Sequence, residues 1–137
     1  MKAKGFAVIT ALMLVVIVSA VILSGCSKSK TEGKLIGKWK VINVANLSDT
    51  VNWETWEFTG DNRVIYGTLR HFNGFDSAVY VRGQFSMDSY KKVDVVGFGK
   101  GYEHVNGTWQ ITKLDESNLM MVNDIGGLLF REMTKVN

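Results

Sequence analysis

The chain has 137 residues, of which 46% are hydrophobic and 21% charged, and its formal net charge is +3 at pH 7. This length is enough to bury one hydrophobic core, and the single cysteine excludes an internal disulfide, so we expect one domain that is stabilised by packing alone. The basic residues form no stripe along the chain, which excludes a typical nucleic-acid-binding surface, and we expect no nucleic-acid partner.

The first 25 residues have the pattern of an export signal. Lys2 and Lys4 form a short basic head, and residues 6–23 are almost entirely apolar. A basic head followed by an apolar stretch and small residues is typical of a secretory signal peptide. About twenty apolar residues can also cross a bilayer, so an uncleaved membrane anchor is the alternative. We expect residues 1–25 to be a signal peptide.

Cys26 directly follows Leu23-Ser24-Gly25, and this stretch resembles the lipobox of bacterial lipoproteins. The resemblance implies that the chain is cut before Cys26 and that the Cys26 thiol carries acyl chains such as palmitate. It further implies a protein of the bacterial cell envelope that is held to a membrane by its N-terminal lipid, at the outer membrane in a Gram-negative cell. Cleavage leaves 14 basic and 13 acidic residues, because Lys2 and Lys4 are the only charged residues removed, and the net charge falls to +1.

Two regions follow the signal. Residues 26–33 are polar after the cysteine, and this composition favours a flexible tether. From residue 34 to residue 137 no helical period recurs, whereas short alternating segments are separated by clusters of glycine, asparagine and aspartate, which is typical of antiparallel strands and tight turns. Strands are predicted over residues 37–44, 51–59, 63–72, 78–86, 91–98, 102–114, 119–123 and 128–135.

Eight short antiparallel strands can close into a barrel or pack as two sheets in a sandwich. Closure removes the exposed strand edges that invite aggregation, and short turns do not provide the long return connection of a Greek key. We therefore predict an all-β fold, an eight-stranded antiparallel up-and-down barrel over residues 34–137. The period of two places Trp39, Trp56 and Trp109 on its inner face, with Lys38 and Lys40 outside.

Four motifs occur in chain order: GKW at 37–39, WEFTGDNRVIY at 56–66, GTWQITKLDESNLMM at 107–121 and LFREM at 129–133. Together they resemble the lipocalin-like domains of bacterial lipoproteins. The resemblance implies that Trp39 closes one end of the barrel beneath Arg131, a cation–π contact worth about 0.5 to 2 kcal/mol, and that Gly37 lets the chain turn into the first strand. The repeat of Gly-x-Trp at Gly107 indicates a second large core residue rather than an internal duplication.

Aromatic residues are the main candidates for a ligand site. Rings with a few polar groups between them suit a small apolar ligand, although the same rings can simply fill the core, and a barrel of this size either is filled by side chains or holds one small molecule. The candidate ligand-binding residues are Trp56, Tyr66, Tyr80, Arg82 and Trp109.

Residues with catalytic chemistry are few. His71 and His104 have no third ligand at a recognisable spacing, and the chain contains neither a nucleophile elbow nor a phosphate-binding loop that opens a helix. We therefore expect no enzymatic activity, no metal site and no cofactor.

The sequence thus predicts a lipid-anchored envelope lipoprotein whose barrel binds or carries a small apolar or amphipathic ligand. The alternative is a protein-binding accessory in which the barrel is a rigid scaffold without a ligand cavity. In that case Trp53, on the strand face opposite Trp56, would be the first candidate anchor for an envelope protein partner.

Overall fold

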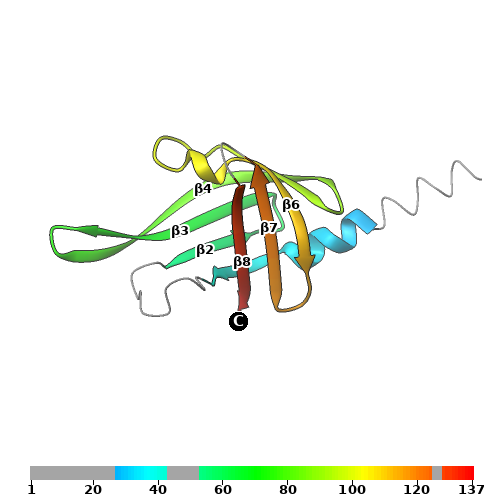
Figure 1. Ribbon diagram of the computed structural model, residues 1–137, viewed down its shortest axis with the longest axis horizontal. Helices are drawn as coiled ribbons and strands as arrows, with labels where there is room; N and C mark the ends of the chain where they lie inside the picture. Colours follow the sequence, from blue (N-terminus) through cyan, green and yellow to red (C-terminus); the bar gives the residue numbers. More distant parts are fainter. Residues whose placement is uncertain (1–26, 43–52, 125–127) are drawn as a thin grey trace, which may run out of the picture.

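The computed structural model describes residues 27–42, 53–124 and 128–137. Its strands pair antiparallel in chain order, and the first strand also pairs with the last, so the sheet closes on itself (Figure 1). The predicted eight-stranded up-and-down barrel is therefore confirmed. The predicted signal peptide and Cys26 lie outside the described residues. The strands are β1 Gly37–Val41, β2 Glu54–Phe58, β3 Arg63–Phe72, β4 Phe75–Ser89, β5 Lys92–Val96, β6 Gly107–Leu114, β7 Asn118–Asp124 and β8 Leu128–Val136.

Tight turns set the register of the first hairpins. Between β2 and β3, Asn62 has a φ of 62°, and the Thr59 N–H donates to the Arg63 carbonyl at 2.9 Å. Between β3 and β4, Asn73 and Gly74 have φ values of 51° and 81°. Two consecutive residues with positive φ match the twist of a hairpin, so pairing continues up to the turn. Strand β4 therefore begins at Phe75, three residues earlier than predicted.

The predicted strand over residues 102–114 is wrong in its first part. Glu103–Val105 forms a short 3₁₀ helix, η1, and β6 begins at Gly107. The Asn106 side chain fixes this segment, because its Oδ1 accepts the Phe98 N–H at 2.9 Å and its Nδ2 donates to the Phe98 carbonyl at 2.7 Å. Phe98 and Val105 are thereby buried in the barrel.

Residues 27–35 are helical, whereas the sequence predicted a flexible tether over 26–33. Although the segment is mostly polar, its last helical residue, Leu35, is fully buried, and this packing stabilises the helical conformation. The Ile36 N–H also donates to the Glu32 carbonyl at 3.1 Å. No helix within the described part of the chain is long and apolar enough to span a membrane.

Trp39 and Trp109 follow the same local design. Each lies two residues after a glycine with positive φ, 135° at Gly37 and 118° at Gly107, and each follows a helical segment. The Trp39 Nε1 donates to the Leu35 carbonyl at 2.8 Å, and the Trp109 Nε1 donates to the Val105 carbonyl at 2.9 Å. Because β1 and β6 run in opposite directions, the two motifs cover opposite ends of the barrel.

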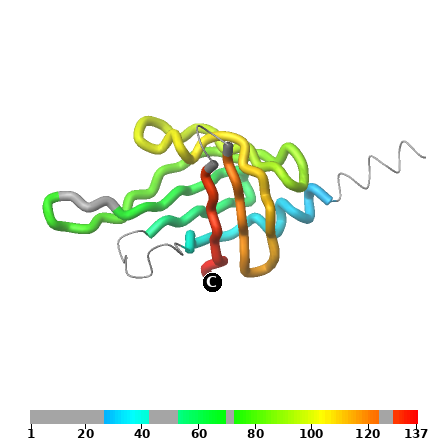
Figure 2. The backbone as a smooth tube through the Cα atoms, in the orientation of Figure 1, coloured from blue at the N-terminus to red at the C-terminus, as the bar shows by residue number. Residues whose placement is uncertain are grey.

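We call these ends the helix end and the loop end. The helix end carries residues 27–35 and the turns that follow β2, β4 and β6. The loop end carries η1 and the outer part of the β3–β4 hairpin, which extends away from the barrel on the side opposite the helix (Figure 2). Aromatic rings pack along the interior between the two ends, with centroids 5.1 Å apart for Trp56 and Trp109 and 5.1 Å apart for Phe58 and Phe85.

Candidate functional site

A charged pair lies inside the barrel near the loop end. The Arg131 Nε donates to Glu54 Oε1 at 2.7 Å, and the Trp56 Nε1 donates to the same oxygen at 2.9 Å. Glu54 opens β2, and Arg131 shares the inward face of β8 with buried Met133. The side chains of Arg131 and Glu54 are only 18% and 19% exposed, so the two charges are largely removed from water.

Tyr66 of β3 lies beside this pair and is 4% exposed. Its hydroxyl oxygen is 3.4 Å from His104 Nε2, and its ring meets the Trp56 and Tyr102 rings edge-on at centroid distances of 5.8 and 6.0 Å. Burial, and after it the negative charge of Glu54, raise the pKa of Tyr66 to about 12. The hydroxyl therefore stays protonated at neutral pH and can donate a hydrogen bond.

These residues form what we call the Glu54–Arg131 cluster: Glu54, Trp56, Tyr66, His104 and Arg131. The cluster combines a guanidinium, a carboxylate, a phenol and an imidazole above packed aromatic rings. Glu54 and Arg131 neutralise each other, so this pair presents donors and acceptors without a net charge. Such a site can hold the polar group of a small amphipathic molecule. No three His, Cys, Asp or Glu side chains among the described residues lie close enough to share a metal ion.

The predicted ligand residues divide between the two faces of the barrel. Trp56, Tyr66 and Trp109 point inward, and the Trp56 ring contacts both of the others. Trp56 and Trp109 are fully buried, so they form the core beneath the cluster. Tyr80 was expected in the interior, and this is wrong, because it is 54% exposed. Arg82, the remaining candidate ligand-binding residue, is exposed on the same outer face.

The register of β4 explains that error. Tyr66 pairs with Val81 and Val64 pairs with Gly83, so odd-numbered residues of β4 share the inner face with Phe85. Even-numbered residues must then point outward, because side chains alternate along a strand. Tyr80 lies over Gly67 on the outside, where a Cβ on Gly67 would come within 2.9 Å of the Tyr80 ring.

The predicted contact between Trp39 and Arg131 is replaced by another pair. Lys135 pairs with Trp39 across β8 and β1, and its Nζ lies 5.1 Å from the centroid of the Trp39 ring. Arg131 lies four residues nearer the loop end and binds Glu54 instead. Gly37 is required in this arrangement, because its φ is 135° and a Cβ there would lie 2.7 Å from Lys135 Cε.

Sequence reasoning missed two members of the cluster, Glu54 and His104. Glu54 could have been found, because it is two residues before inward Trp56 and therefore points inward as well. A charged residue on the inner face of a strand is an unusual signal. His104 could not have been found in this way, since it lies in η1 rather than in the strand that was predicted there.

No protein-family model matches this chain, and no curated protein matches it by sequence. Among solved structures, a lipocalin-like protein from Bacteroides uniformis is similar, with 17% identity and a TM-score of 0.49 over 76% of this chain and 100% of that chain. Bovine odorant-binding protein, in complexes with its natural ligand and with undecanal, has 16% identity and a TM-score of 0.44 over 76% of this chain and 72% of that chain. These likenesses concern the course of the backbone.

Proposed function

We propose that this chain is a lipid-anchored protein of the bacterial cell envelope whose barrel binds or carries a small amphipathic ligand. The observation that supports this best is the Glu54–Arg131 pair, which is about four-fifths covered inside a barrel filled by aromatic rings. Removing two charges from water is costly, and apolar residues of similar size would often stabilise a core at least as well. Hydrogen bonding to the polar group of a bound ligand would be a functional reason for keeping this charged pair inside the barrel.

The chemistry of the cluster favours a ligand with an uncharged polar group. Glu54 already neutralises Arg131, so an added carboxylate would be repelled by Glu54 and an added ammonium by Arg131. A hydroxyl or carbonyl avoids both penalties and can accept a hydrogen bond from Arg131 or from the protonated Tyr66 hydroxyl. The apolar body of the ligand would then rest against the partly buried side chains of Tyr102 and Leu129.

The test uses the full chain, expressed in bacteria and reconstituted in phosphatidylcholine vesicles. Octan-1-ol, octanoate and octylammonium share one apolar chain and differ in the charge of the polar group. We expect octan-1-ol to change the tryptophan fluorescence at the lowest concentration, because the Trp56 indole is bonded to Glu54. The Tyr66→Phe and Arg131→Gln variants should each bind it roughly tenfold more weakly, the scale of one lost hydrogen bond to a charged or buried group.

Arg82→Gln is the matched control for Arg131→Gln, because it removes the same charge from the outer face of the barrel. The control also corrects for alcohol that dissolves in the vesicle. Equal binding by Arg131→Gln, Tyr66→Phe and the control would contradict a site at the cluster, provided that circular dichroism shows all three folded. Turnover of an ester or phosphoester by the purified protein would contradict the non-enzymatic role that we propose.

The membrane anchor in this proposal is supported by the lipobox resemblance at Cys26. Mass spectrometry of the purified protein tests it directly. We expect a chain that begins at Cys26 and carries the added mass of acyl chains, and a Cys26→Ser variant that lacks this mass and leaves the membrane fraction. A mature chain without acyl mass would contradict the anchor and leave the ligand proposal standing.

A second candidate is the protein-binding accessory. Trp53 and Tyr80 form an edge-on pair with ring centroids 5.7 Å apart, and Lys38 Nζ lies 5.9 Å from the Tyr80 centroid. This aromatic surface lies outside the barrel, and Tyr80 is half exposed. Loss of a co-purifying envelope protein in Trp53→Ala, without a change in octan-1-ol binding, would favour docking over ligand carriage.

A further inference from the structure

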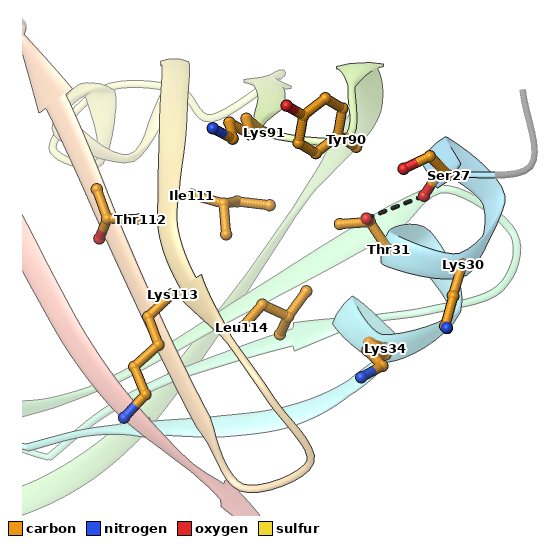
Figure 3. A pocket seen from close by; sticks show the side chains of 10 residues that line it. All are labelled: Ser27, Lys30, Thr31, Lys34, Tyr90, Lys91, Ile111, Thr112, Lys113 and Leu114. Carbon is orange, nitrogen blue, oxygen red and sulfur yellow. Dashed lines mark hydrogen bonds between the residues drawn. The ribbon is translucent and has the colours of Figure 1, made fainter. Parts of the chain in front are cut away.

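A surface pocket of 280 Å³ lies at the helix end, far from the Glu54–Arg131 cluster. It is bounded by the helical segment 27–35, by the turn between β4 and β5 and by the last residues of β6 (Figure 3). Three elements distant in the sequence thus supply its walls. The helical conformation of residues 27–35, which the sequence did not predict, is what creates it.

Four of the ten residues that line the pocket are lysines. Lys30 and Lys34 extend from the helix, Lys91 comes from the β4–β5 turn, and Lys113 comes from β6, while no acidic residue lines the pocket. Glu116 reaches Lys34 at 3.4 Å and Asp115 reaches Lys113 at 3.7 Å from outside the lining. No carboxylate of the described residues pairs with Lys30 or Lys91. Lys30 and Lys91 are therefore the lysines of this lining that are available to pair with an added anion.

The same pocket has an apolar wall. Ile111 and Leu114 lie between the lysines, and Tyr90, which is 49% exposed, stands beside Lys91 at the rim. The Lys91 Nζ lies 5.3 Å from the centroid of the Tyr90 ring. Ammonium groups next to the exposed Tyr90 ring and the partly buried Leu114 side chain match a molecule that is anionic at one end and apolar at the other.

The position of the pocket identifies the source of that molecule. Ser27 lines the pocket and follows Cys26 directly, so the residue that would carry the acyl chains is the chain neighbour of a lining residue, with about 3.8 Å between their Cα atoms. We propose that this lysine pocket binds the phosphate of an anionic phospholipid headgroup in the membrane that holds Cys26, which rests on the lipid anchoring proposed above. The barrel then stands with its helix end on the membrane, and the Glu54–Arg131 cluster lies toward the opposite end.

The experiment uses the acylated full-chain product in vesicles of phosphatidylcholine alone or of an equal mixture of phosphatidylcholine and phosphatidylglycerol. A water-soluble acetylating reagent modifies exposed lysines, and peptide mass spectrometry gives the rate at each site. We expect Lys30 and Lys91 to react roughly tenfold more slowly in the mixed vesicles, because each lysine near an anionic surface gains about a fivefold preference and the pocket adds shielding. Lys40 and Lys100, exposed elsewhere, should react equally in both.

Two double variants, each of which removes two positive charges, distinguish lipid binding in the pocket from non-specific attraction by the surface charge. Lys30→Gln/Lys91→Gln should lose phosphatidylglycerol that remains bound to the protein in native mass spectrometry, while Lys40→Gln/Lys100→Gln should keep it. Retention by both variants, or equal lysine rates in the two kinds of vesicle, would overturn the proposal. So would protection of Lys30 and Lys91 by inorganic phosphate in phosphatidylcholine vesicles, since that result assigns the pocket to a free anion.

The intact mass of the purified protein distinguishes failure of the proposed lipid anchor from failure of the proposed lysine pocket. A product without acyl mass removes the anchor and this proposal with it. Octan-1-ol binding is measured separately, at the other end of the barrel, and its outcome does not depend on the lysine pocket.

Discussion

Glu54 and Arg131 are two charges that the fold keeps inside the barrel. Their side chains are 19% and 18% exposed, so each depends on the other for compensation of its lost hydration. The Trp56 indole supplies one further hydrogen bond to Glu54, at 2.9 Å. The pair is therefore expected to be costly to break from one side only.

Replacing Arg131 by methionine should lower the free energy of unfolding by about 3 kcal/mol, because it leaves the Glu54 carboxylate buried without its partner. Urea unfolding followed by circular dichroism measures this loss. The double variant Glu54→Gln/Arg131→Met should recover most of it, and Arg82→Met on the outer face should change stability little. A single variant as stable as the double would contradict a mutual dependence of the two charges.

Tyr66 gives the protein a stability change in alkali. Its pKa is raised from 10.0 to about 12 in the folded state, so the folded protein holds this proton over a range in which the unfolded chain has lost it. The contribution of the protonated Tyr66 to the free energy of unfolding is complete below pH 10.0 and is lost as the pH rises to about 12. The difference in unfolding free energy between the native protein and Tyr66→Phe should therefore shrink across this range. A constant difference in urea unfolding would mean that Tyr66 titrates normally.

At the scale of single elements, two short motifs close the barrel. Each has a helical segment, a glycine with positive φ and a tryptophan whose indole N–H bonds to a carbonyl four residues earlier. The bond satisfies a carbonyl at the end of each helical segment and fixes the ring over one end of the barrel. Gly-x-Trp thus recurs in the sequence because the same local structure closes each end of the barrel.

Gly37→Ala tests the first of these motifs. A φ of 135° is strained for alanine, and its Cβ would meet Lys135 Cε at 2.7 Å, so we expect a loss of about 1 to 3 kcal/mol in unfolding free energy. Gly60→Ala is the matched control, since no atom lies within 4 Å of the place that its added methyl group would occupy and its φ is not positive. Equal stability of the two variants would show that the strain at Gly37 is absent.

Gly33→Ala tests the helical segment itself. Gly33 lies within residues 27–35, and nothing lies within 4 Å of an added Cβ. Alanine favours a helix over glycine, so the variant should be more stable by about 0.5 kcal/mol and should show slower amide exchange at residues 30–35. The flexible tether that the sequence suggested would respond to this substitution with neither change.

At the scale of the whole molecule, the barrel has two unlike ends. The helix end gathers lysines beside an apolar wall, and the loop end holds the charged pair and carries the extended β3–β4 hairpin. Strand β4 is longer than its neighbour β5, which pairs with it only from Gln84 to Ser89. Among the described residues, the segment Phe75–Val81 therefore has a strand partner on one side only.

Amide hydrogen exchange should reveal this difference. We expect peptides from residues 75–81 to exchange faster than peptides from residues 84–89, because local opening costs less where a strand is paired on one side. The measurement is exchange followed by mass spectrometry on the full chain. Equal protection of the two segments would indicate that another part of the chain covers the free edge of the hairpin.

The order of the strands was predictable because it depends on local patterns. Alternation of apolar and polar residues, glycine at the turns and short connections are properties of neighbours in the chain, and together they predicted the closed barrel and the inward tryptophans. The predictions failed where a local pattern was ambiguous. Tyr80 fits an aromatic inner face by composition, yet its even position in β4 places it outside with Arg82.

Local sequence patterns account for the barrel and its aromatic interior, whereas the contacts between distant side chains depend on how the barrel closes. Glu54 and Arg131 are 77 residues apart, and their contact depends on the register of closure between the first and last strands. The same register puts Lys135, and not Arg131, over Trp39. The lysine pocket likewise exists only because a helix packs beside two distant strand ends. Contacts of this kind are set by the closed barrel as a whole, since no local stretch of sequence contains both partners.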